Sequence, residues 1–372
     1  MIRFDIHRAA AVARKEVMHI MRDPFTLVLV LGLPVLLVVF FGFAIDFDVK
    51  NLKLAVYDRD NSRVSRQLAA VFESSGYFLP SGAVSPAGAI TGLDADRFSA
   101  ALLIEPGFGR DIGRGAAARA QFVADGADNS KAMAVLGYLP GISAAALRKF
   151  SGAAAADPVP LKSRYMYNPE LNSRWFVIPG LAVIIIGLLS ILMTALTVAR
   201  EWENGSMELL LSTPLRPAEI IAGKIAPYVV LILGGVFFVN LAARFGFGVP
   251  FRGNLLLLLG GTVLYIVAAL SQGIVISVVT RQQQLAMQLS MISGLLPSLL
   301  LSGFIFPIES MPVFFRYFTM LLSPRWFMET VRGITIRGAG AADLAVPLLA
   351  LAGLSAVLLT AAFKKFKTDL EP

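Results

Sequence analysis

The chain has 372 residues, of which 56% are hydrophobic and 16% are charged, and its mean hydropathy is +0.70. Soluble proteins carry about 25% charged residues, so this composition excludes a wholly soluble protein and favours one that contacts lipid. The net charge of +8 does not indicate nucleic-acid binding, because Lys and Arg flank apolar blocks and we find no DNA- or RNA-binding motif. The lack of cysteine in this chain excludes disulfides, thiolate catalysis and iron–sulfur clusters.

The first 24 residues combine apolar and basic side chains at roughly helical spacing. This pattern is typical of a helix that lies in the membrane interface, so we predict a cytoplasmic interfacial elbow helix at 1–24. Asp23 and Pro24 then end this helix and turn the chain into the membrane. The alternative is a basic flank that only sets the membrane topology.

Six segments are long and apolar enough to cross a membrane, because about 20 helical residues span a hydrocarbon core about 30 Å thick. None of the six contains Lys, Arg, Asp or Glu. We predict spans at 25–45, 175–198, 225–243, 254–280, 282–308 and 344–363. The first apolar run is longer than that of a typical signal peptide, so we expect a retained anchor.

Lys and Arg are more frequent in the N-terminal flank, the loop after the second span and the tail at 364–372 than in the opposite short loops. The positive-inside rule therefore predicts that both termini are cytoplasmic. The interval 46–172 then lies on the outer side, where short buried runs at 53–57, 98–104 and 120–124 alternate with helical patterns. The predicted fold is a polytopic α-helical membrane protein with six transmembrane helices and an inserted mixed α/β extracytoplasmic domain.

The loop at 199–224 places Glu201, Glu203 and Glu208 on the side where basic residues are expected. Glu201 and Glu208 are seven residues apart, about two helical turns, so we expect them to share one helix face. Leucines at 209–211 add an apolar patch. An acidic helix face beside an apolar patch indicates a docking surface for a partner protein. The alternative is an ordinary solvated loop.

The segment 309–343 is too apolar for a free loop and too interrupted for a span. We predict a re-entrant or periplasmic segment, because non-helical backbone at membrane depth must be shielded by protein or line a wet cavity. The residues that we expect to shape it are Pro307, Met311, Pro312, Pro324 and Arg325. The alternative is an aromatic belt at the membrane interface.

The fifth predicted span carries small and methionine side chains on one face, three or four residues apart. Such a face could line a pathway for apolar substrates or pack closely against a neighbouring helix. Polar residues of the second and fourth spans leave the same two alternatives open. The candidate pathway residues are Thr194, Thr197, Gln272, Met287, Met291, Ser298 and Ser302. The predicted spans contain no carboxylate for a proton relay, which argues against a proton-driven antiporter.

Several motifs resemble those of ABC-2-type transporter permeases, and together they cover essentially the whole chain. The elbow residues Lys15, Glu16, Arg22, Asp23 and Pro24 match the family's N-terminal helix, and 302–333 resembles its second signature. Asp58, Asp60-Asn61-Ser62 and the run at 104–108 are similar to the drug-exporter branch, which has a large periplasmic domain between the first two spans. The loop residues that resemble the first signature are Arg200, Glu201, Glu203, Asn204, Gly205, Glu208, Leu211, Thr213 and Pro214. Asn204-Gly205-Ser206 departs from the commoner Gly-Thr spelling.

The resemblance implies a permease subunit in a bacterial inner membrane. It would pair with a second copy or a related permease, and a separate subunit carrying ATP and Mg²⁺ would contact the 200–214 loop. A periplasmic adaptor and an outer-membrane channel are further implied partners, and drug-like amphiphiles are the implied substrates. The alternative is a non-transporting protein that transmits ATPase motion to its periplasmic domain.

The chain is not expected to be an enzyme or to bind a cofactor or metal itself. It lacks the G-x-x-x-x-G-K-[ST] loop that holds nucleotide phosphates. His7 and His19 are its two histidines, and their spacing does not suit a metal site. No histidine lies in the predicted outer domain, so a Ser-His-Asp triad is excluded there.

Overall fold

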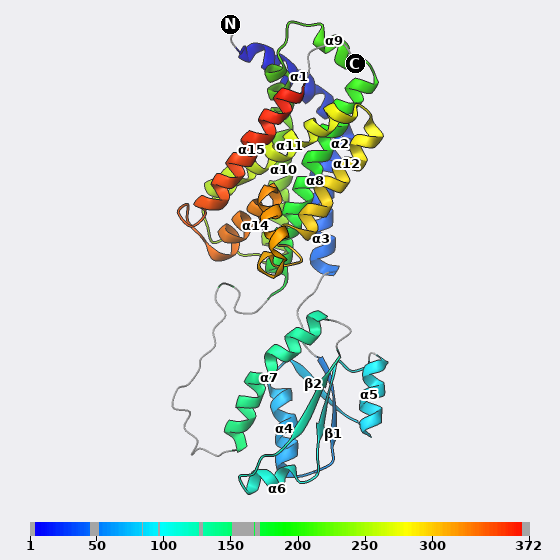
Figure 1. Ribbon diagram of the computed structural model, residues 1–372, viewed down its shortest axis with the longest axis vertical. Coiled ribbons are helices and arrows are strands. Elements are labelled where there is room, and N and C mark those ends of the chain that lie inside the picture. Colours follow the sequence, from blue (N-terminus) through cyan, green and yellow to red (C-terminus); the bar gives the residue numbers. More distant parts are fainter. Residues whose placement is uncertain are drawn as a thin grey trace. The chain divides into compact units, whose positions relative to one another are not determined.

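The computed structural model describes residues 4–44, 52–83, 85–95, 97–125, 129–150, 167 and 172–366, and the chain forms two compact units (Figure 1). One unit is Phe47–Arg164, and the other joins Met1–Asp46 to Tyr165–Pro372. Residues 151–166 and the tail from 367 onward lie outside the described residues.

The smaller unit is built on a four-stranded sheet with the order β2-β1-β3-β4. β1 pairs in parallel with both β2 and β3, whereas β4 is antiparallel to β3. The strands are β1 (Leu52–Asp58), β2 (Phe78–Gly82), β3 (Ala100–Ile104) and β4 (Ala120–Ala124). The mixed α/β character predicted for this interval is therefore present in the described residues.

Helices cover both faces of this sheet (Figure 1). Leu54 packs with residues of α4 and α7, whereas its neighbour Ala55 packs with Ala89 of α5, because successive strand residues point to opposite faces. The helix Arg63–Ser74 begins directly after Ser62, whose hydroxyl accepts a hydrogen bond from the Ser65 amide at 3.0 Å and so caps the helix. The helices are α4 (Arg63–Ser74), α5 (Pro86–Asp94), α6 (Phe108–Gly113) and α7 (Asn129–Phe150).

The larger unit is helical, and five of its described helical segments are long and apolar enough to cross a membrane. The first of these is continuous over Pro24–Ala44 but contains a π-helical turn at Val28–Gly32. The turn ends two residues before Pro34, which has no N–H to donate. The other four are α8 (Arg174–Glu203), α10 (Pro217–Phe247), α11 (Leu255–Thr280) and α15 (Ala345–Lys365). The first segment is built from α2 (Pro24–Leu27), the π turn and α3 (Leu33–Ala44), and α1 (Ile6–Arg22) precedes it.

The predicted segment at 282–308 is not one continuous helix. α12 covers Gln283–Leu300, and the chain then leaves the helical backbone. Pro297 lies in the last turn of α12, and Gly303 has a left-handed φ of 83°, a conformation that glycine adopts at no steric cost. The helix that the sequence suggested therefore ends about two turns early.

The segment after α12 forms several short helices rather than a free loop. α13 (Val313–Phe318) and α14 (Ser323–Arg332) are joined by a 3₁₀ turn at Thr319–Leu321. A further 3₁₀ turn at Ile308–Ser310 precedes them, and a π turn at Gly333–Arg337 follows. Pro312 directly precedes α13, and Pro324 lies in the first turn of α14, where its fixed φ suits the helix.

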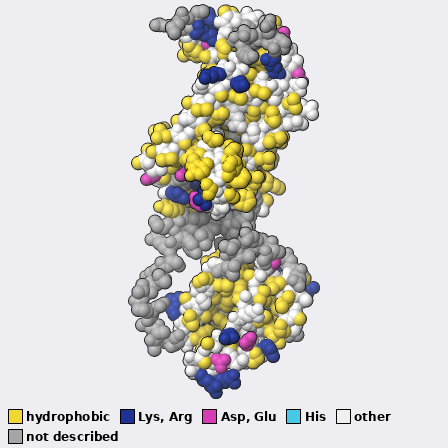
Figure 2. Space-filling model, in the orientation of Figure 1, with side chains coloured by type: hydrophobic (Ala, Val, Ile, Leu, Met, Phe, Trp, Pro, Cys, Tyr) yellow, Lys and Arg dark blue, Asp and Glu magenta, His cyan; other side chains and the backbone are white. Residues whose placement is uncertain are grey.

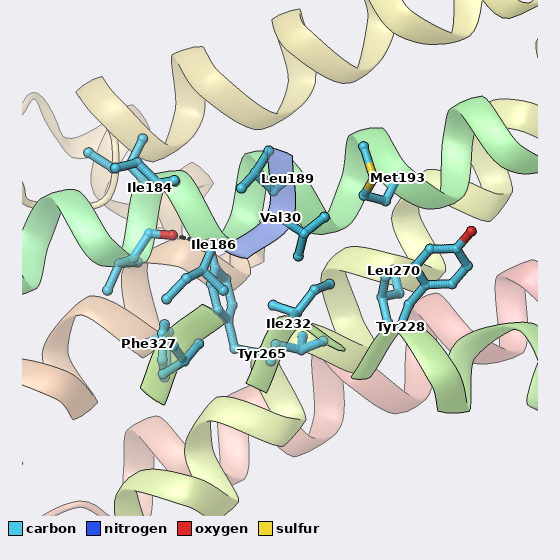
Figure 3. Close-up of a cluster of buried hydrophobic side chains, with 14 of the residues drawn as sticks. Val30, Ile184, Ile186, Leu189, Met193, Tyr228, Ile232, Tyr265, Leu270 and Phe327 are labelled. Atoms are coloured by element: carbon cyan, nitrogen blue, oxygen red, sulfur yellow. Dashed lines mark hydrogen bonds between the residues drawn. The ribbon is translucent and has the colours of Figure 1, made fainter. Parts of the chain in front are cut away.

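α8 lies in the middle of the helical unit, and residues around most of its circumference are buried. Figure 3 shows Ile184, Ile186 and Leu189 of α8 in the main apolar cluster, with Tyr265 of α11 beside Phe327 of α14. The Tyr265 hydroxyl donates to the carbonyl of Val183 at 3.1 Å. On the outside, hydrophobic side chains cover the helical unit, and Lys and Arg gather near the end that carries α1 (Figure 2).

Candidate coupling site

The residues of the predicted docking loop meet the N-terminal helix at one end of the helical unit (Figure 1). Four elements come together there: α1, the last turns of α8, the short helix α9 (Ser206–Leu211) and the first turns of α10. The site brings the two ends of the docking loop, 199–224, against a segment about 200 residues earlier in the chain.

α1 packs along the start of α10 through one face. The buried residues of α1 are Ala9, Val12, Glu16 and Ile20, which recur at three or four residues and so share one side of the helix. A Cβ on Gly223 of α10 would lie 2.6 Å from Cβ of Val12 and 2.7 Å from the carbonyl oxygen of Ala9. Glycine at 223 is therefore needed for the two backbones to approach this closely.

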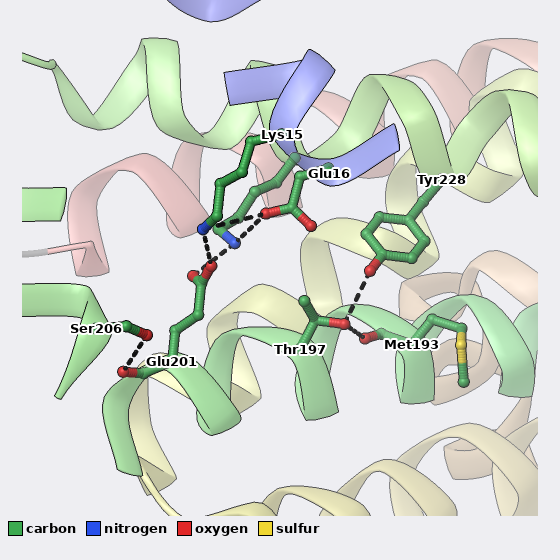
Figure 4. A network of polar contacts seen from close by, with 8 residues as sticks. Lys15, Glu16, Met193, Thr197, Glu201, Ser206 and Tyr228 are labelled. Atoms are coloured by element: carbon green, nitrogen blue, oxygen red, sulfur yellow. Dashed lines mark hydrogen bonds and ion pairs between the residues drawn. The ribbon is translucent and has the colours of Figure 1, made fainter. Parts of the chain in front are cut away.

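Two lysines and two glutamates form a compact ion-pair cluster between these helices (Figure 4). Lys224 Nζ of α10 lies 2.8 Å from Oε1 of Glu16 and 2.6 Å from Oε2 of Glu201. Lys15 Nζ lies 2.7 Å from Oε1 of Glu201. We call these four residues, Lys15, Glu16, Glu201 and Lys224, the ion-pair cluster. It ties α1 to the end of α8 and to the start of α10 at the same point.

The ion-pair cluster is unevenly exposed. Glu16 and Lys224 are each only 1% exposed, whereas the Lys15 side chain is 52% exposed. Partial burial of Lys15 disfavours its charged form, but the hydrogen bond and the negative charge of Glu201 outweigh this and raise the pKa of Lys15. The cluster contains two positive and two negative charges, so burial leaves no net charge to be solvated.

A second polar contact between α8 and α10 lies one helical turn from the ion-pair cluster, toward the middle of both helices. The hydroxyls of Thr197 and Tyr228 are 2.9 Å apart, and Thr197 also donates to the carbonyl of Met193 at 2.7 Å (Figure 4). Thr197, a candidate for the pathway, therefore joins α8 to α10 beneath the ion-pair cluster.

The N-terminal end of α1 is tied to the other side of the docking loop. The amide of Asp5 donates to Oε1 of Glu219 at 2.9 Å, and the amide of Arg216 donates to Oε2 of the same side chain at 3.0 Å. The guanidinium of Arg8 donates to the carbonyl of Pro214 at 2.5 Å. α1 therefore contacts both the beginning and the end of the docking loop.

α9 projects between these anchored ends. Gly205 precedes it with a left-handed φ of 71°, which breaks the helix between Glu203 and Ser206. Met207 of α9 is fully buried, whereas Glu208 is exposed and Leu209 is 73% exposed. The expectation that Glu201 and Glu208 share one helical face is wrong, because the break places them on different helices.

The predicted contact residues thus separate into two groups. Glu201 is engaged inside the ion-pair cluster, and Glu203 accepts a hydrogen bond at 2.5 Å from Gln283 of α12, which itself accepts from Arg200 at 3.3 Å. Asn204, Glu208, Thr213 and Pro214 are exposed, and the side chain of Leu211 lies outside the described part of the structure. Glu208 has no ion-pair or hydrogen-bond partner in the described residues.

The elbow residues also have different environments. Asp23 caps α2 by accepting from the amides of Phe25 and Thr26 and from the Thr26 hydroxyl at 2.7 Å. The hydrogen bond from the Thr26 side chain contributes most to a lowered pKa of Asp23. Pro24 occupies the first position of α2, and Arg22 is exposed at the end of α1. Asp23 and Pro24 thus make the turn that the sequence predicted.

The candidate pathway residues are not gathered on one surface. Thr194 is buried between α8 and α11, where its hydroxyl donates to the carbonyl of Leu270 at 2.9 Å. Gln272 donates to the Ser293 hydroxyl at 3.3 Å and lines a small cavity. Ser298 and Ser302 are buried, whereas Met287 and Met291 are exposed. The buried face of α12 instead runs through Ala286, Ser290, Gly294 and Ser298.

The residues predicted to shape the re-entrant segment lie at the ends of its short helices. Pro307 directly precedes the first 3₁₀ turn, Pro312 directly precedes α13 and Pro324 occupies the first turn of α14. Met311 is buried, and its carbonyl accepts from Arg316 at 2.9 Å. Arg325 donates to the carbonyl of Arg316 at 2.7 Å and lies over the ring of Trp326. The arrangement is compact, and its depth in a membrane stays a prediction.

A helical bundle with several segments long and apolar enough to cross a membrane is characteristic of a polytopic membrane protein. Within the described residues, no group of three or more His, Asp or Glu side chains could hold a metal ion. The profile of the ABC-2 family transporter proteins matches residues 24–364. The chain therefore belongs to the ABC-2 family of transporter permeases.

Individual relatives agree along nearly the whole chain. It is 31% identical over 368 residues to the probable multidrug ABC transporter permease YbhS of Escherichia coli, covering 98% of each chain. It is 29% identical to the probable multidrug ABC transporter permease YbhR of the same organism, covering 90% of this chain and 91% of that one. The inner membrane transport permease YhhJ of Escherichia coli is 31% identical and covers 85% of each chain. These relatives are permeases, which confirms the resemblance carried by the sequence motifs.

Sequence reasoning named Lys15, Glu16 and Glu201 but not the pairing of Glu16 and Glu201 with Lys224. The residues are 208 positions apart for Glu16 and Lys224, so no local pattern connects them. A signal was nevertheless present: Glu16 falls on the apolar stripe of α1, between Val12 and Ile20. A carboxylate on a buried stripe requires a cationic partner from another element.

Proposed function

We propose that this chain is the membrane subunit of an exporter driven by ATP that a separate subunit hydrolyses, and that α9 is the docking element for that subunit. The observation that carries the proposal is the contrast within the docking loop. Both ends of the loop are fixed by buried or paired side chains, whereas Glu208 and Leu209 of α9 are exposed and unpartnered in the described residues. An exposed acidic and apolar helix between two anchored ends is suited to bind a partner and pass its motion to the spans.

The membrane topology follows from the same proposal. We place α12 and the non-helical residues after it, up to 308, as a sixth span, since the 18 helical residues alone reach about 27 Å of the hydrocarbon core of about 30 Å. Both termini and α9 then lie in the cytoplasm and the α/β unit lies in the periplasm of a bacterial inner membrane. ATP and Mg²⁺ would be bound by the partner subunit.

The assembly would contain two permeases, either two copies of this chain or this chain and a related one. The relatives YbhS and YbhR are named as probable multidrug ABC transporter permeases, which supports drug-like amphiphiles as substrates. A periplasmic adaptor and an outer-membrane channel would extend the route across the envelope. The second candidate function is transmission of ATPase motion to the α/β unit without transport, which the same anchored loop would support.

The test is co-purification of the full-length protein from native membranes with mass spectrometry of the bound chains. We expect a stoichiometric nucleotide-binding subunit with the wild type and its loss in Glu208→Lys, which reverses the charge of the exposed face of α9. The matched control is Glu73→Lys, an exposed charge reversal on α4 of the α/β unit, which should retain the subunit. Retention by Glu208→Lys would refute docking at α9.

The two candidate functions are separated by a transport measurement. Cells that express the protein and its ATPase should accumulate less of a fluorescent amphiphilic dye, and Glu208→Lys should restore accumulation. Binding of the ATPase without any change in the accumulation of amphiphiles would favour the transmission function instead.

A further inference from the structure

A cavity outside the coupling site opens between α10 and α11. It has a volume of about 490 Å³, within the range of about 300–1,000 Å³ that is typical of ligand sites. Its inner wall is formed by α8 and α14, where Ile186 and Phe327 belong to the apolar core (Figure 3). The loop at 248–254 joins α10 to α11 at one end of the cavity.

The outer rim of this cavity is made of side chains that face away from the protein. Phe237, Leu241 and Phe245 recur every four residues on α10 and are 63%, 43% and 78% exposed. Leu255 and Leu259 of α11 are exposed on the opposite rim. Since both helices are long enough to span a membrane, this rim faces lipid, and an acyl chain can enter from the side.

The polar lining residues are mostly satisfied inside their own helices. The Asn240 side-chain amide donates to the carbonyl of Val236 at 2.9 Å, and the Thr262 hydroxyl donates to the carbonyl of Leu258 at 2.6 Å. Arg244 differs, because its guanidinium has no hydrogen-bond or ion-pair partner among the described residues, and none of the lining residues is acidic. The cavity is therefore apolar along its length and carries one unpaired positive charge.

Arg244 lies in the last turn of α10, where a 31-residue helix reaches the membrane surface. Arginine at this depth extends to the level of lipid phosphates, and its planar fork suits bidentate hydrogen bonds to a phosphate. An apolar cavity that is open to lipid and has a cation at the interfacial end matches an amphiphile with one anionic headgroup. A second protein chain would need a carboxylate at that point and would not fill a lateral cavity of this depth.

We propose that this cavity binds an anionic phospholipid, with an acyl chain between α10 and α11 and the phosphate held by Arg244. The site does not depend on the proposed transport function. The bound lipid stabilises the packing of α10 and α11 against α8 and α14, because its acyl chain fills a cavity that is otherwise lined by exposed apolar side chains.

The experiment uses full-length protein, purified in detergent and stripped of lipid, in native mass spectrometry with phosphatidylglycerol or phosphatidylcholine of identical chains. The wild type should bind phosphatidylglycerol about fivefold more tightly, the effect of one basic residue near a charged headgroup. Arg244→Gln should bind both lipids equally. The control Arg337→Gln, an exposed arginine that does not line the cavity, should keep the preference.

Filling the cavity tests the acyl-chain half of the site. Ala182→Phe on the inner wall should remove one bound lipid, and Leu255→Trp at the exposed rim should do the same without disturbing the core. Thermal unfolding of each variant identifies any loss of fold. The proposal is overturned if Arg244→Gln retains the preference, if folded Leu255→Trp keeps its full lipid complement, or if the stripped wild type binds no lipid because a second copy fills the cavity.

Discussion

Replacement of Lys224 by methionine removes the central cation of the ion-pair cluster while keeping side-chain length. Glu16 is 1% exposed and would lose its partner at 2.8 Å, its nearest remaining cation being Lys15 at 4.0 Å. Glu201 would keep Lys15 at 2.7 Å. Removal of one partner from a buried ion pair costs about 3–5 kcal/mol, since the other charge remains buried. We expect the whole of this cost to fall on Glu16.

The assay is thermal unfolding of detergent-solubilised protein, monitored by size-exclusion chromatography. A cost of about 3–5 kcal/mol corresponds to a Tm lower by roughly 6–20 °C for a unit of this size. Lys15→Met is the control: Lys15 is 52% exposed and Glu201 retains Lys224, so the expected cost is below about 1 kcal/mol.

A double variant distinguishes the energy lost with the ion pair from the cost of leaving the Glu16 carboxylate buried without a partner. Glu16→Gln with Lys224→Met leaves no unpaired buried charge in the cluster, so it should be more stable than Lys224→Met alone. Equal Tm values for Lys224→Met and Lys15→Met, or no recovery in the double variant, would refute the reasoning.

Two further predictions concern packing and pH. Gly187→Ala would place a Cβ 2.0 Å from the Tyr265 hydroxyl and should cost about 1–3 kcal/mol, whereas Gly260→Ala on α11, with no atom within 4 Å, should leave the Tm nearly unchanged. In the α/β unit, hydrogen bonds from Ser62 and from the amides of Gly109 and Gly107 lower the pKa of Asp60. Its contribution is therefore present above the ordinary Asp pKa and lost as the pH falls below about 4. Urea unfolding of 47–164, which we expect to fold alone in water, should show a weaker acid dependence in Asp60→Asn; an unchanged pH profile would contradict this role.

The sequence predicted the long apolar helices because their signal is strong and local. It overextended the segment at 282–308, where Pro297 and Gly303 interrupt an apolar run that composition alone treats as continuous. It did not predict β2, whose Pro80 and Gly82 are unusual in strands and are tolerated because β2 is at the sheet edge.

The candidate site was predicted in part. Motif resemblance singled out the loop at 199–224, whose docking role stays a prediction. Helical spacing did not place its residues, because the break at Gly205 puts Glu201 and Glu208 on different helices. The methionine face of α12 illustrates a similar limit. Met287 and Met291 share a periodic stripe with Gly294 and Ser298, yet α8 covers only the smaller residues, because close helix packing selects side chains by volume.

The ion-pair cluster also constrains the order in which the protein can assemble. α1 is synthesised first, but Lys224, the partner of Glu16, follows 208 residues later. At about 5–20 residues per second, this interval lasts about 10–40 s. During that time Glu16 lacks the partner that it has in the folded protein, and the surface of α10 against which α1 packs has not been made. Packing of α1 against α10 is therefore a late step, and a chain in which α8 and α10 are misplaced leaves the buried face of α1 uncovered.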